Sequence, residues 1–380
     1  MEILYVTSYP LEYNTSANVR NISIIKGFIR NGHKVYTLSP YPTDRAFYSG
    51  KLIDIPIQKR FWIGPQGDIS ATNKKVTRPN RLKKIIYKWY NTFAVYDRCS
   101  RFKKYVDADV VNMTFDVIVS SSDPKSAHLL AEKLIKIKPD ICSRWIQYWG
   151  DPFIGDITGN TALKYYLTKK EERRIIAKSD KAIYVSPFTA EEVISRYPEV
   201  KNKVYFYPIP YIEQSETLSN ETLEPMLSYM GNYTLSTRDI RPFVQAVSEL
   251  KVKTVIIGDS DLRLKANESL SVRERVPSDE LNSITDATTI FVCVCNTHGS
   301  QIPGKIYHYA GTNKAILIIL DGEKASEMKQ YFESFNRFYL CRNNVLDIKE
   351  AITTILQDNK TFNIPPDMLR PEVISEKFLK

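Results

Sequence analysis

Short apolar runs alternate along this chain with longer segments whose apolar residues recur at helical spacing. Residues 2–7, 289–295 and 314–320 are continuous runs rich in β-branched residues, which is typical of strands buried on both faces of a parallel sheet. Residues 18–31 instead space their isoleucines and Phe28 so that most of them share one face of a helix. Repeated strand and helix alternation of this kind predicts the α/β class with doubly wound parallel sheets.

The alternation occurs in two rounds, separated by a segment rich in proline, serine and threonine. A chain of 380 residues suits two domains. We expect an N-terminal domain over 1–210, a linker over 211–225, a C-terminal domain over 226–360, and a tail over 361–380 that packs back on the N-terminal domain. The predicted strands are 2–7, 34–38, 116–122, 144–148, 181–185, 204–207, 226–230, 253–257, 289–295, 314–320 and 338–341, and the predicted helices are 18–31, 127–136, 164–179, 189–196, 241–250, 278–283, 303–311, 322–335 and 345–356.

The composition is that of a folded soluble protein, which we expect to stay in the cytoplasm. Hydrophobic residues make up 43% of the chain and charged residues 25%, as in ordinary globular proteins. No apolar run reaches the roughly 18 residues that cross a bilayer, and the first residues predict a strand rather than a signal peptide. Five cysteines, an odd number, fit reduced thiols. Cys293 and Cys295 form a lone pair without a second pair, which is poor evidence for zinc, so no metal is expected.

The formal charge of +10 is unevenly placed along the chain. Residues 1–212 carry 34 basic and 20 acidic side chains, whereas residues 213–380 carry 19 and 23. The strongest bias lies in residues 74–105, which we call the basic-aromatic segment, where a single acid, Asp97, faces eleven cations interleaved with aromatic residues. Two interpretations stay open: a helix packed on the core with a solvated basic face, or a surface that lies on an anionic membrane. Nucleic acid is disfavoured because no known nucleic-acid-binding motif accompanies the charge.

Residues 288–319 form a strand, loop, helix and strand with the features of a diphosphate site. Pro303 suits the first turn of the helix and Gly311 marks its end. Backbone N–H groups at a helix start, with Lys305 in the first turn, attract a phosphate or diphosphate. Because α/β proteins repeat this unit several times, and a first-turn lysine is commonly just solvated, these residues alone leave a purely structural role open.

Four motifs follow one another in a fixed order along nearly the whole chain. The first is DVIVSSSDPKSAHLLA (116–131) with WIQYWGDPF (145–153), and the others are YMGNYTLSTRDIRPFVQA (229–246), VIIGDSD (255–261) and PGKIYHYAGTNKAILII (303–319). Together they resemble the pattern of glycosyltransferase family 4, especially its bacterial polysaccharide enzymes. The resemblance implies the GT-B architecture, in which two doubly wound Rossmann-like domains face each other across a cleft. The first domain would bind the acceptor and the second a nucleotide-sugar donor.

The resemblance also implies a donor site that needs no metal or other cofactor, with the nucleotide-diphosphate sugar as substrate. Arg238 and Lys305 match the basic pair that grips the donor diphosphate, which agrees with the negative charge that a diphosphate leaving group gains. His308 stands where the family has a glutamate that contacts the ribose, and Ser300 stands where it has a second acid, so the sugar and the stereochemical outcome stay open. The implied donor-binding residues are Gly231, Asn232, Arg238, Gly258, Asp259, Ser300, Gln301, Ile302, Pro303, Gly304, Lys305 and His308.

On the acceptor side, the family's Asp-Pro-aromatic position is occupied by Asp151. It would deprotonate the acceptor hydroxyl in an inverting reaction, or only position the acceptor in a retaining one. The alternative is that Asp151 has only a structural role, as a helix cap or as a residue that fixes its loop. The other implied acceptor contacts are Trp149 and the loop residues Asn14, Thr15 and Ser16, although this loop lacks the family's paired glycines.

These features predict a glycosyltransferase at the inner face of the membrane. It would move a sugar from a nucleotide diphosphate, with UDP the expected nucleotide, to a glycan acceptor, expected to be lipid-linked, in bacterial surface polysaccharide synthesis. The basic-aromatic segment would hold the first domain against anionic lipid, and no nucleic-acid partner is expected. Two rivals stay open: a nucleotide-sugar epimerase of the same fold, and an inactive GT-B subunit that binds lipid or a partner enzyme. The missing acids at 300 and 308 favour the second.

Overall fold

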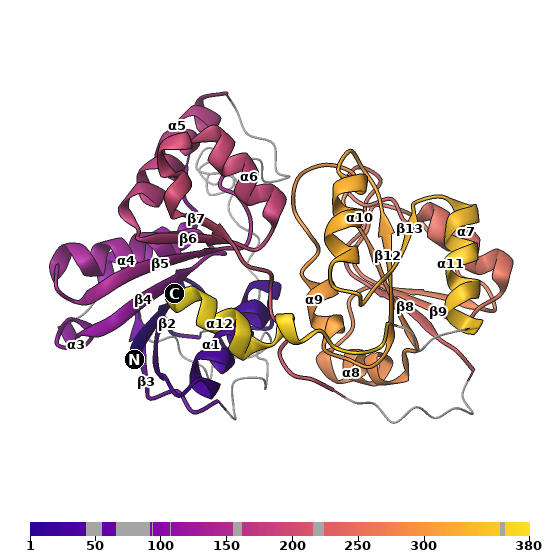
Figure 1. Ribbon diagram of the computed structural model, residues 1–380, viewed down its shortest axis with the longest axis horizontal. Coiled ribbons are helices and arrows are strands. Elements are labelled where there is room, and N and C mark those ends of the chain that lie inside the picture. Colours follow the sequence, from indigo (N-terminus) through magenta and orange to yellow (C-terminus); the bar gives the residue numbers. More distant parts are fainter. Residues whose placement is uncertain are drawn as a thin grey trace, which may run out of the picture. The chain divides into compact units, whose positions relative to one another are not determined.

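The computed structural model describes residues 1–42, 55–65, 92, 94–106, 108–154, 162–215, 224–357 and 362–380. These residues form two units, each built around one parallel sheet (Figure 1). The first unit contains Met1–Pro208 and Pro371–Lys380, and the second contains Ile209–Arg370. The chain therefore returns to the first unit with its C-terminal helix.

The described part of the first unit has a seven-stranded sheet. Its strands are β1 (Glu2–Val6), β2 (Lys34–Pro40), β3 (Lys59–Ile63), β4 (Phe115–Ser121), β5 (Cys142–Trp149), β6 (Lys181–Tyr184) and β7 (Val204–Phe206). Its helices are α1 (Ser16–Arg30), the 3-10 helix η3 (Arg98–Tyr105), α3 (Ala108–Val111), α4 (Ser126–Ile137), α5 (Ala162–Lys178), α6 (Pro187–Arg196), the 3-10 helix η4 (Pro198–Lys203) and α12 (Pro371–Leu379). The strand order is β3-β2-β1-β4-β5-β6-β7 and all pairings are parallel, so the winding reverses between β1 and β4.

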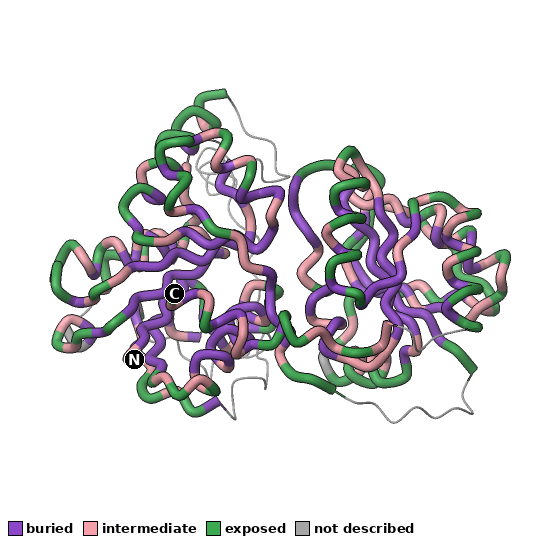
Figure 2. Tube along the Cα trace, viewed as in Figure 1, coloured by how far each residue is buried: buried purple, intermediate pink, exposed green. Residues whose placement is uncertain are grey.

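The core of the first unit lies between this sheet and its helices. Ile3 and Leu4 are adjacent in β1 and point to opposite faces, yet both are fully buried, and the strands make up much of the buried trace in Figure 2. On one side, α12 packs along α1 (Figure 1). The helices approach so closely at Gly27 that a Cβ atom there would lie 2.2 Å from the carbonyl oxygen of Pro371. The C-terminal helix is thus part of the folded first unit.

The described part of the second unit has a six-stranded parallel sheet. Its strands are β8 (Leu227–Met230), β9 (Thr254–Ile257), β10 (Leu270–Arg273), β11 (Ile290–Val294), β12 (Ala315–Leu320) and β13 (Tyr339–Arg342). Its helices are α7 (Arg241–Leu250), α8 (Ser278–Ala287), α9 (Lys305–Ala310), α10 (Ala325–Glu333), α11 (Val345–Gln357) and the 3-10 helix η5 (Asp367–Leu369). The order β10-β9-β8-β11-β12-β13 reverses between β8 and β11, as the first sheet reverses between β1 and β4. Residues 362–370 belong to this unit, where the buried guanidinium of Arg337 donates to the carbonyl of Phe362 at 2.5 Å.

The α/β class and the doubly wound parallel sheets are confirmed. Each strand predicted from an apolar run is present, with ends within two residues of those expected. β10 was not predicted, because only Leu270 of its four residues is buried and no apolar run marks it. The helix predicted over 189–196 begins earlier, at Pro187, because the hydroxyl of Ser186 caps it. The helix predicted from residue 303 is shorter, spanning only Lys305–Ala310.

The structure describes only the end of the basic-aromatic segment. Residues 74–91 and 93 lie outside the described residues, so the prediction of one or two helices there stays a prediction. Residues 98–105 form η3, whose N-terminus is capped by the side chain of Asp97, which accepts from the N–H of Cys99 at 2.8 Å. Of the helices that the structure describes, none is long and apolar enough to cross a membrane.

Candidate functional site

The strand order of each sheet indicates where a ligand would bind. Open parallel sheets bind ligands beyond the carboxyl ends of the strands at which the winding reverses. In the first unit these are β1 and β4, which lead to Ser8 and to Ser122 and Asp123. In the second unit these are β8 and β11, which lead to Gly231 and to Asn296. Polar residues therefore gather at both reversal points.

In the second unit, Arg238 lies at the reversal point. It follows the glycine loop after β8, and its Nη1 donates to the carbonyl of Asn232 at 3.2 Å. Its Nη2 donates to Oδ1 of Asn296, after β11, at 2.6 Å. Its Nε is buried and has no hydrogen-bond partner among the described residues. The guanidinium is thus held across the ends of β8 and β11 by neutral oxygens.

Lys305 reaches the same point from α9. Its side chain is exposed at the first position of the helix, and its Nζ donates to the carbonyl of Met230, the last residue of β8, at 2.6 Å. Burial raises the pKa of the Cys293 thiol on β11 to about 12, and the positive charges of Arg238 and Lys305 oppose that rise. Both cations therefore lie near the carboxyl ends of β8 and β11, so the structure brings the predicted basic pair together.

The glycine loops after β8 and β9 touch each other beside these cations. A Cβ atom on Gly258 would lie 1.9 Å from the carbonyl oxygen of Gly231, so this contact requires glycine. The N–H of Asp259 donates to Oδ1 of Asn232 at 3.3 Å. Arg275, after β10, pairs with Asp259 at 2.6 Å and donates to the same Asn232 oxygen at 3.2 Å. The four predicted loop residues thus cluster. Arg275 joins them, although no apolar run in the sequence marks β10, the strand that precedes it.

The loop that leads into α9 differs from the expected helix-start site. Ser300, Gln301 and Ile302 are buried, and the half-buried Pro303 and Gly304 precede a helix of only six residues. So short a helix has a small macrodipole, so the argument for an anion site rests on the two cations and not on the helix start. His308 lies half-buried near the C-terminal end of α9, at the position where the family has an acid.

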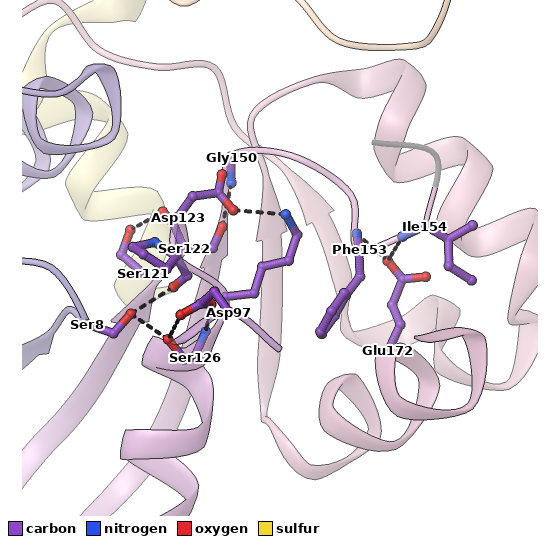
Figure 3. A network of polar contacts seen from close by, with 12 residues as sticks. Ser8, Asp97, Ser121, Ser122, Asp123, Ser126, Gly150, Phe153, Ile154 and Glu172 are labelled. Atoms are coloured by element: carbon purple, nitrogen blue, oxygen red, sulfur yellow. Dashed lines mark hydrogen bonds and ion pairs between the residues drawn. The ribbon is translucent and has the colours of Figure 1, made fainter. Parts of the chain in front are cut away.

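In the first unit, the predicted Asp151 forms a pair with an acid that the sequence reasoning missed. Asp123 follows β4 and lies between two cis peptide bonds, Ser122–Asp123 and Asp123–Pro124. Asp151 follows β5, which neighbours β4 in the sheet. The negative charge of Asp123 acts on the carboxyl of Asp151, and the ammonium of Lys125 lies 3.0 Å from Oδ1 of Asp123. Figure 3 shows Asp123 within the surrounding polar network.

The two carboxyls of this pair differ in acidity. Burial raises the pKa of Asp151 to about 7, and the negative charge of Asp123 adds to the rise. For Asp123, burial also favours the neutral form, but the positive charges of Lys125 and Arg20 outweigh it and hold the pKa below its usual range. Near pH 7 the pair therefore carries one proton for part of the time, and that proton belongs chiefly to Asp151.

Neighbouring backbone and side chains fix this pair in place. Ser122 Oγ accepts from the N–H of Gly150 at 3.0 Å, which joins the loops after β4 and β5 (Figure 3). The Arg20 side chain is 5% exposed, lies 4.9 Å over the ring of Tyr148, and fills the space where a Cβ atom on Gly150 would be, 1.7 Å from its Nη1. A larger residue immediately before Asp151 would therefore have to displace the guanidinium of Arg20.

The loop after Asp151 is held by a buried glutamate. Glu172 on α5 is fully buried and accepts from the N–H groups of Phe153 at 2.8 Å and Ile154 at 3.4 Å (Figure 3). Arg196 lies 3.2 Å from its other oxygen, and the hydroxyl of Tyr197 donates to that oxygen at 3.0 Å. Burial raises the pKa of Glu172, although Arg196 and these donors oppose the rise. The Asp151 loop is thus anchored on both sides.

Asp97 links the end of the basic-aromatic segment to the same edge of the sheet. Its Oδ1 accepts from the hydroxyl of Ser126 at 2.7 Å and its Oδ2 from the N–H of Ser126 at 3.2 Å, at the start of α4. The hydroxyls of Ser126 and Ser8 lie 2.8 Å apart, and Ser8 donates to the carbonyl of Pro124 (Figure 3). The one acid of the segment therefore has a structural role that fixes η3 beside the loop of the acid pair.

The other predicted acceptor contacts are placed differently. Trp149 is fully buried and its Nε1 donates to Gln147, so it offers no surface to an acceptor and that prediction is wrong. Thr15 caps α1, its hydroxyl accepting from the N–H of Asn18 at 3.1 Å. Asn14 and Ser16 on either side of it are exposed.

Metal ligands are sparse in the residues that the structure describes. No group of three or more histidine, cysteine, aspartate or glutamate side chains lies close enough there to hold a metal ion. All five cysteines lie in the described ranges and none forms a disulfide.

Comparison with solved structures identifies the fold. No family model and no curated protein sequence matches this chain. Among solved structures, Anabaena Alr3699/HepE in complex with UDP and glucose is similar at TM-score 0.57 and 11% identity, over 99% of this chain and 95% of that one. Sucrose-phosphate synthase from Thermosynechococcus elongatus gives 0.54 and 12%, over 98% and 94%.

A third similar structure is an alpha-glucosyltransferase in complex with UDP and a 13-mer DNA, with TM-score 0.53 and 12% identity over 100% of this chain and 95% of that one. At such low identities the similarity establishes the fold and nothing finer. The fold of this chain is therefore GT-B, with two Rossmann-like α/β domains and sheets of seven and six strands in the described residues.

Proposed function

We propose that this chain is a glycosyltransferase that takes a sugar from a nucleotide-diphosphate donor bound in the second unit. The observation that carries the proposal is the meeting of Arg238 and Lys305 at the carboxyl ends of β8 and β11. A diphosphate gains negative charge as the bond to the sugar breaks, and two fixed cations stabilise that charge. The reversal point of the sheet is also where this fold class places a nucleotide.

UDP is the nucleotide that we propose. The solved structures of HepE and of the alpha-glucosyltransferase, both similar in fold, hold UDP. The cluster of Asn232, Asp259 and Arg275 lies beside the two cations, and its amide, carboxylate and guanidinium groups offer both donors and acceptors to a nucleoside. His308, half-buried on α9, can hydrogen-bond a ribose hydroxyl in place of the family's glutamate.

The donor assignment is tested by thermal denaturation with UDP, GDP, ADP, TDP and CMP and their sugars. A ligand at about 100 times its dissociation constant adds about 2.7 kcal/mol of stability. Arg238→Ala and Lys305→Ala each remove a charge-assisted hydrogen bond, so we expect roughly 10-fold to 100-fold weaker binding of the preferred diphosphate. Lys329→Ala on α10 is the matched control, because this lysine is exposed and paired within its own helix. Equal affinity of all variants would refute the site, and stabilisation by none of the nucleotides would favour an inactive subunit.

We propose further that this chain is a family 4 glycosyltransferase that works at the cytoplasmic face of the membrane. Its acceptor would be a lipid-linked glycan in the synthesis of bacterial surface polysaccharide. Support comes from η3, where Arg101, Lys103 and Lys104 are exposed beside the half-buried Phe102 and the exposed Tyr105. Cations flanked by aromatic rings suit an anionic lipid interface.

The membrane assignment has its own experiment. Each basic residue near an anionic surface adds about 1 kcal/mol, so replacing Arg101, Lys103 and Lys104 by Glu should weaken binding to phosphatidylserine vesicles at least roughly 100-fold. The control is a triple variant of the second unit in which three exposed lysines, Lys251, Lys253 and Lys265, are each replaced by Glu. Sedimentation with vesicles measures both. An equal loss in the two triple variants would show a response to net charge alone and would refute a specific surface.

A further inference from the structure

Four exposed apolar side chains lie together at the start of helix α5 (Figure 2). They are Leu163, Tyr165, Tyr166 and Leu167, whose exposed fractions lie between 37% and 63%. A single exposed leucine is common on protein surfaces, but a contiguous apolar group marks a surface that binds a partner. We call these four residues the α5 patch.

The α5 patch lies where the helix extends beyond its packing against the sheet. The buried residues of α5 share one face and begin only at Thr168, followed by Glu172, Ile175 and Ile176. None of residues 162–167 is buried, and at 1.5 Å per residue they extend the helix by about 9 Å. Leu163, Tyr166 and Leu167, at spacings of three and four, share the face opposite to the buried one. These three side chains therefore point away from the core of the first unit.

The start of α5 lies toward the carboxyl edge of the first sheet. The helix connects the parallel strands β5 and β6, so it begins near the carboxyl end of β5 and ends near the amino end of β6. Asp151, directly after β5, lies at the same edge. A partner that covers the α5 patch is thus held near the edge at which this fold class binds ligands.

The charges that follow the α5 patch are positive. Lys169 and Lys170 are exposed, and neither forms an ion pair with a residue that the structure describes. The two acids that come next, Glu171 and Glu172, are already paired with arginines of the same unit. A second copy of the chain on the patch would bring like charges together, whereas an anionic partner would complement them.

The basic-aromatic segment reaches the same helix. The hydroxyl of its Tyr96 donates to Oε1 of Glu171 at 2.9 Å, and the Tyr96 ring packs edge-on against Phe153 with 5.0 Å between the ring centroids. Arg98, two residues further on, is exposed. The segment thus adds positive charge beside the helix that carries the α5 patch.

We propose that the α5 patch inserts into the interface of an anionic bilayer. Its three outward side chains enter the region below the phosphates, and Lys169 and Lys170 contact the headgroups. Tyrosine suits this depth because its ring is apolar and its hydroxyl is polar, and nearby lysines attract anionic lipid. The inference rests on the proposed function and deepens it: η3 supplies mainly charge, whereas α5 supplies the apolar contact that holds the acceptor edge of the sheet at the membrane.

Vesicle binding tests the patch at constant net charge. In the full chain, replacing Leu163, Tyr166 and Leu167 by Ser should weaken binding to vesicles of phosphatidylglycerol and phosphatidylcholine by at least roughly 30-fold, because these side chains no longer gain by leaving water. The matched control carries the same change at three exposed apolar residues elsewhere, Ile137, Leu346 and Ile364. It should bind as wild type does. Failure of the wild type to bind, or equal binding by the two triple variants, overturns the proposal.

A second measurement places the patch in the bilayer. The tryptophan introduced by Tyr166→Trp should be quenched by lipids with brominated acyl chains, measured as the difference from wild type, whereas the one introduced by Leu346→Trp should not. Lys169→Gln combined with Lys170→Gln should weaken vesicle binding by about 10-fold. Equal quenching at positions 166 and 346 overturns insertion.

The outcome for the lipid surface can be separated from that for the proposed function. The triple-serine variant of the α5 patch should keep the stabilisation by UDP, because the patch belongs to the first unit and the donor site to the second. If no nucleotide stabilises the protein while this variant loses vesicle binding, the glycosyltransferase assignment fails and the lipid surface stands. If sedimentation velocity without lipid shows a dimer that this variant dissociates, a second copy covers the patch and the proposal is overturned.

Discussion

The acid pair makes a prediction about stability that needs no substrate. In the folded protein the pKa of Asp151 is about 7, against an ordinary value of 3.8. Between pH 4 and 7 the folded state therefore holds a proton that the unfolded state has released, so the free energy of unfolding falls as the pH rises through this window. Above pH 7 the loss is complete. Asp151→Asn removes the titrating group and should remove this loss.

The size of the effect follows from the shift. At about 1.4 kcal/mol per pH unit, a rise from 3.8 to about 7 corresponds to about 4 kcal/mol. Part of it reflects the interaction with Asp123, whose pKa moves in the opposite direction, so we expect Asp151→Asn to be more stable than wild type by roughly 2–4 kcal/mol at pH 8. At pH 4 the two proteins should be equally stable, because a neutral aspartic acid resembles asparagine in shape and hydrogen bonding.

The assay is urea unfolding followed by tryptophan fluorescence at pH 4 and at pH 8. All four tryptophans of the chain precede residue 209, so the signal reports on the first unit even where the two units unfold separately. Asp140→Asn, which changes an exposed acid in the turn before β5, should show no such pH dependence relative to wild type. A difference between Asp151→Asn and wild type that is the same at both pH values would refute the raised pKa of Asp151.

Three further substitutions test the packing that supports the site, and the same unfolding assay measures each of them. Gly150→Ala would place a Cβ atom 1.7 Å from Nη1 of Arg20 and should lower the free energy of unfolding by about 1–3 kcal/mol. An unchanged free energy of unfolding would mean that Arg20 moves freely. Gly27→Ala would place a Cβ atom 2.2 Å from the Pro371 carbonyl oxygen and separate α12 from α1, so it should lower the free energy of unfolding by a similar amount. Unchanged stability would refute that packing. Glu172→Gln weakens the bonds to the loop and should cost about 1–3 kcal/mol, with unchanged stability as the contrary result.

The strands of both sheets could be predicted from the sequence because a parallel strand buried on both faces consists of consecutive apolar residues. β11, expected over 289–295, spans Ile290–Val294 for this reason. β10 lacks such a run: Ser271 is exposed and Val272 only half-buried, because the strand lies at the edge of its sheet. With β10 unmarked, nothing in the sequence connected Arg275 with the loops after β8 and β9.

The candidate site was predicted in part. Arg238 and Lys305 were paired through a family pattern, and the structure brings both to the end of β8. Asp123 was missed because its importance depends on Asp151, and their contact exists only once β4 and β5 lie side by side. Trp149 was misassigned because it precedes the Gly-Asp turn in sequence, whereas its place at the end of β5 turns its ring into the core.

The two units repeat one strand order but differ in the charge at the point where it reverses. In the second unit the guanidinium of Arg238 is held by two neutral oxygens and the ammonium of Lys305 by a backbone carbonyl. These contacts fix both cations without neutralising them, which suits an anionic ligand. In the first unit the cations Lys125 and Arg20 face carboxylates, so their charge serves to set the acidity of the pair. The two units thus share a topology but differ in the partners of the cations at the reversal point, and the neutral oxygens around the cations of the second unit are what the diphosphate site that we propose there requires.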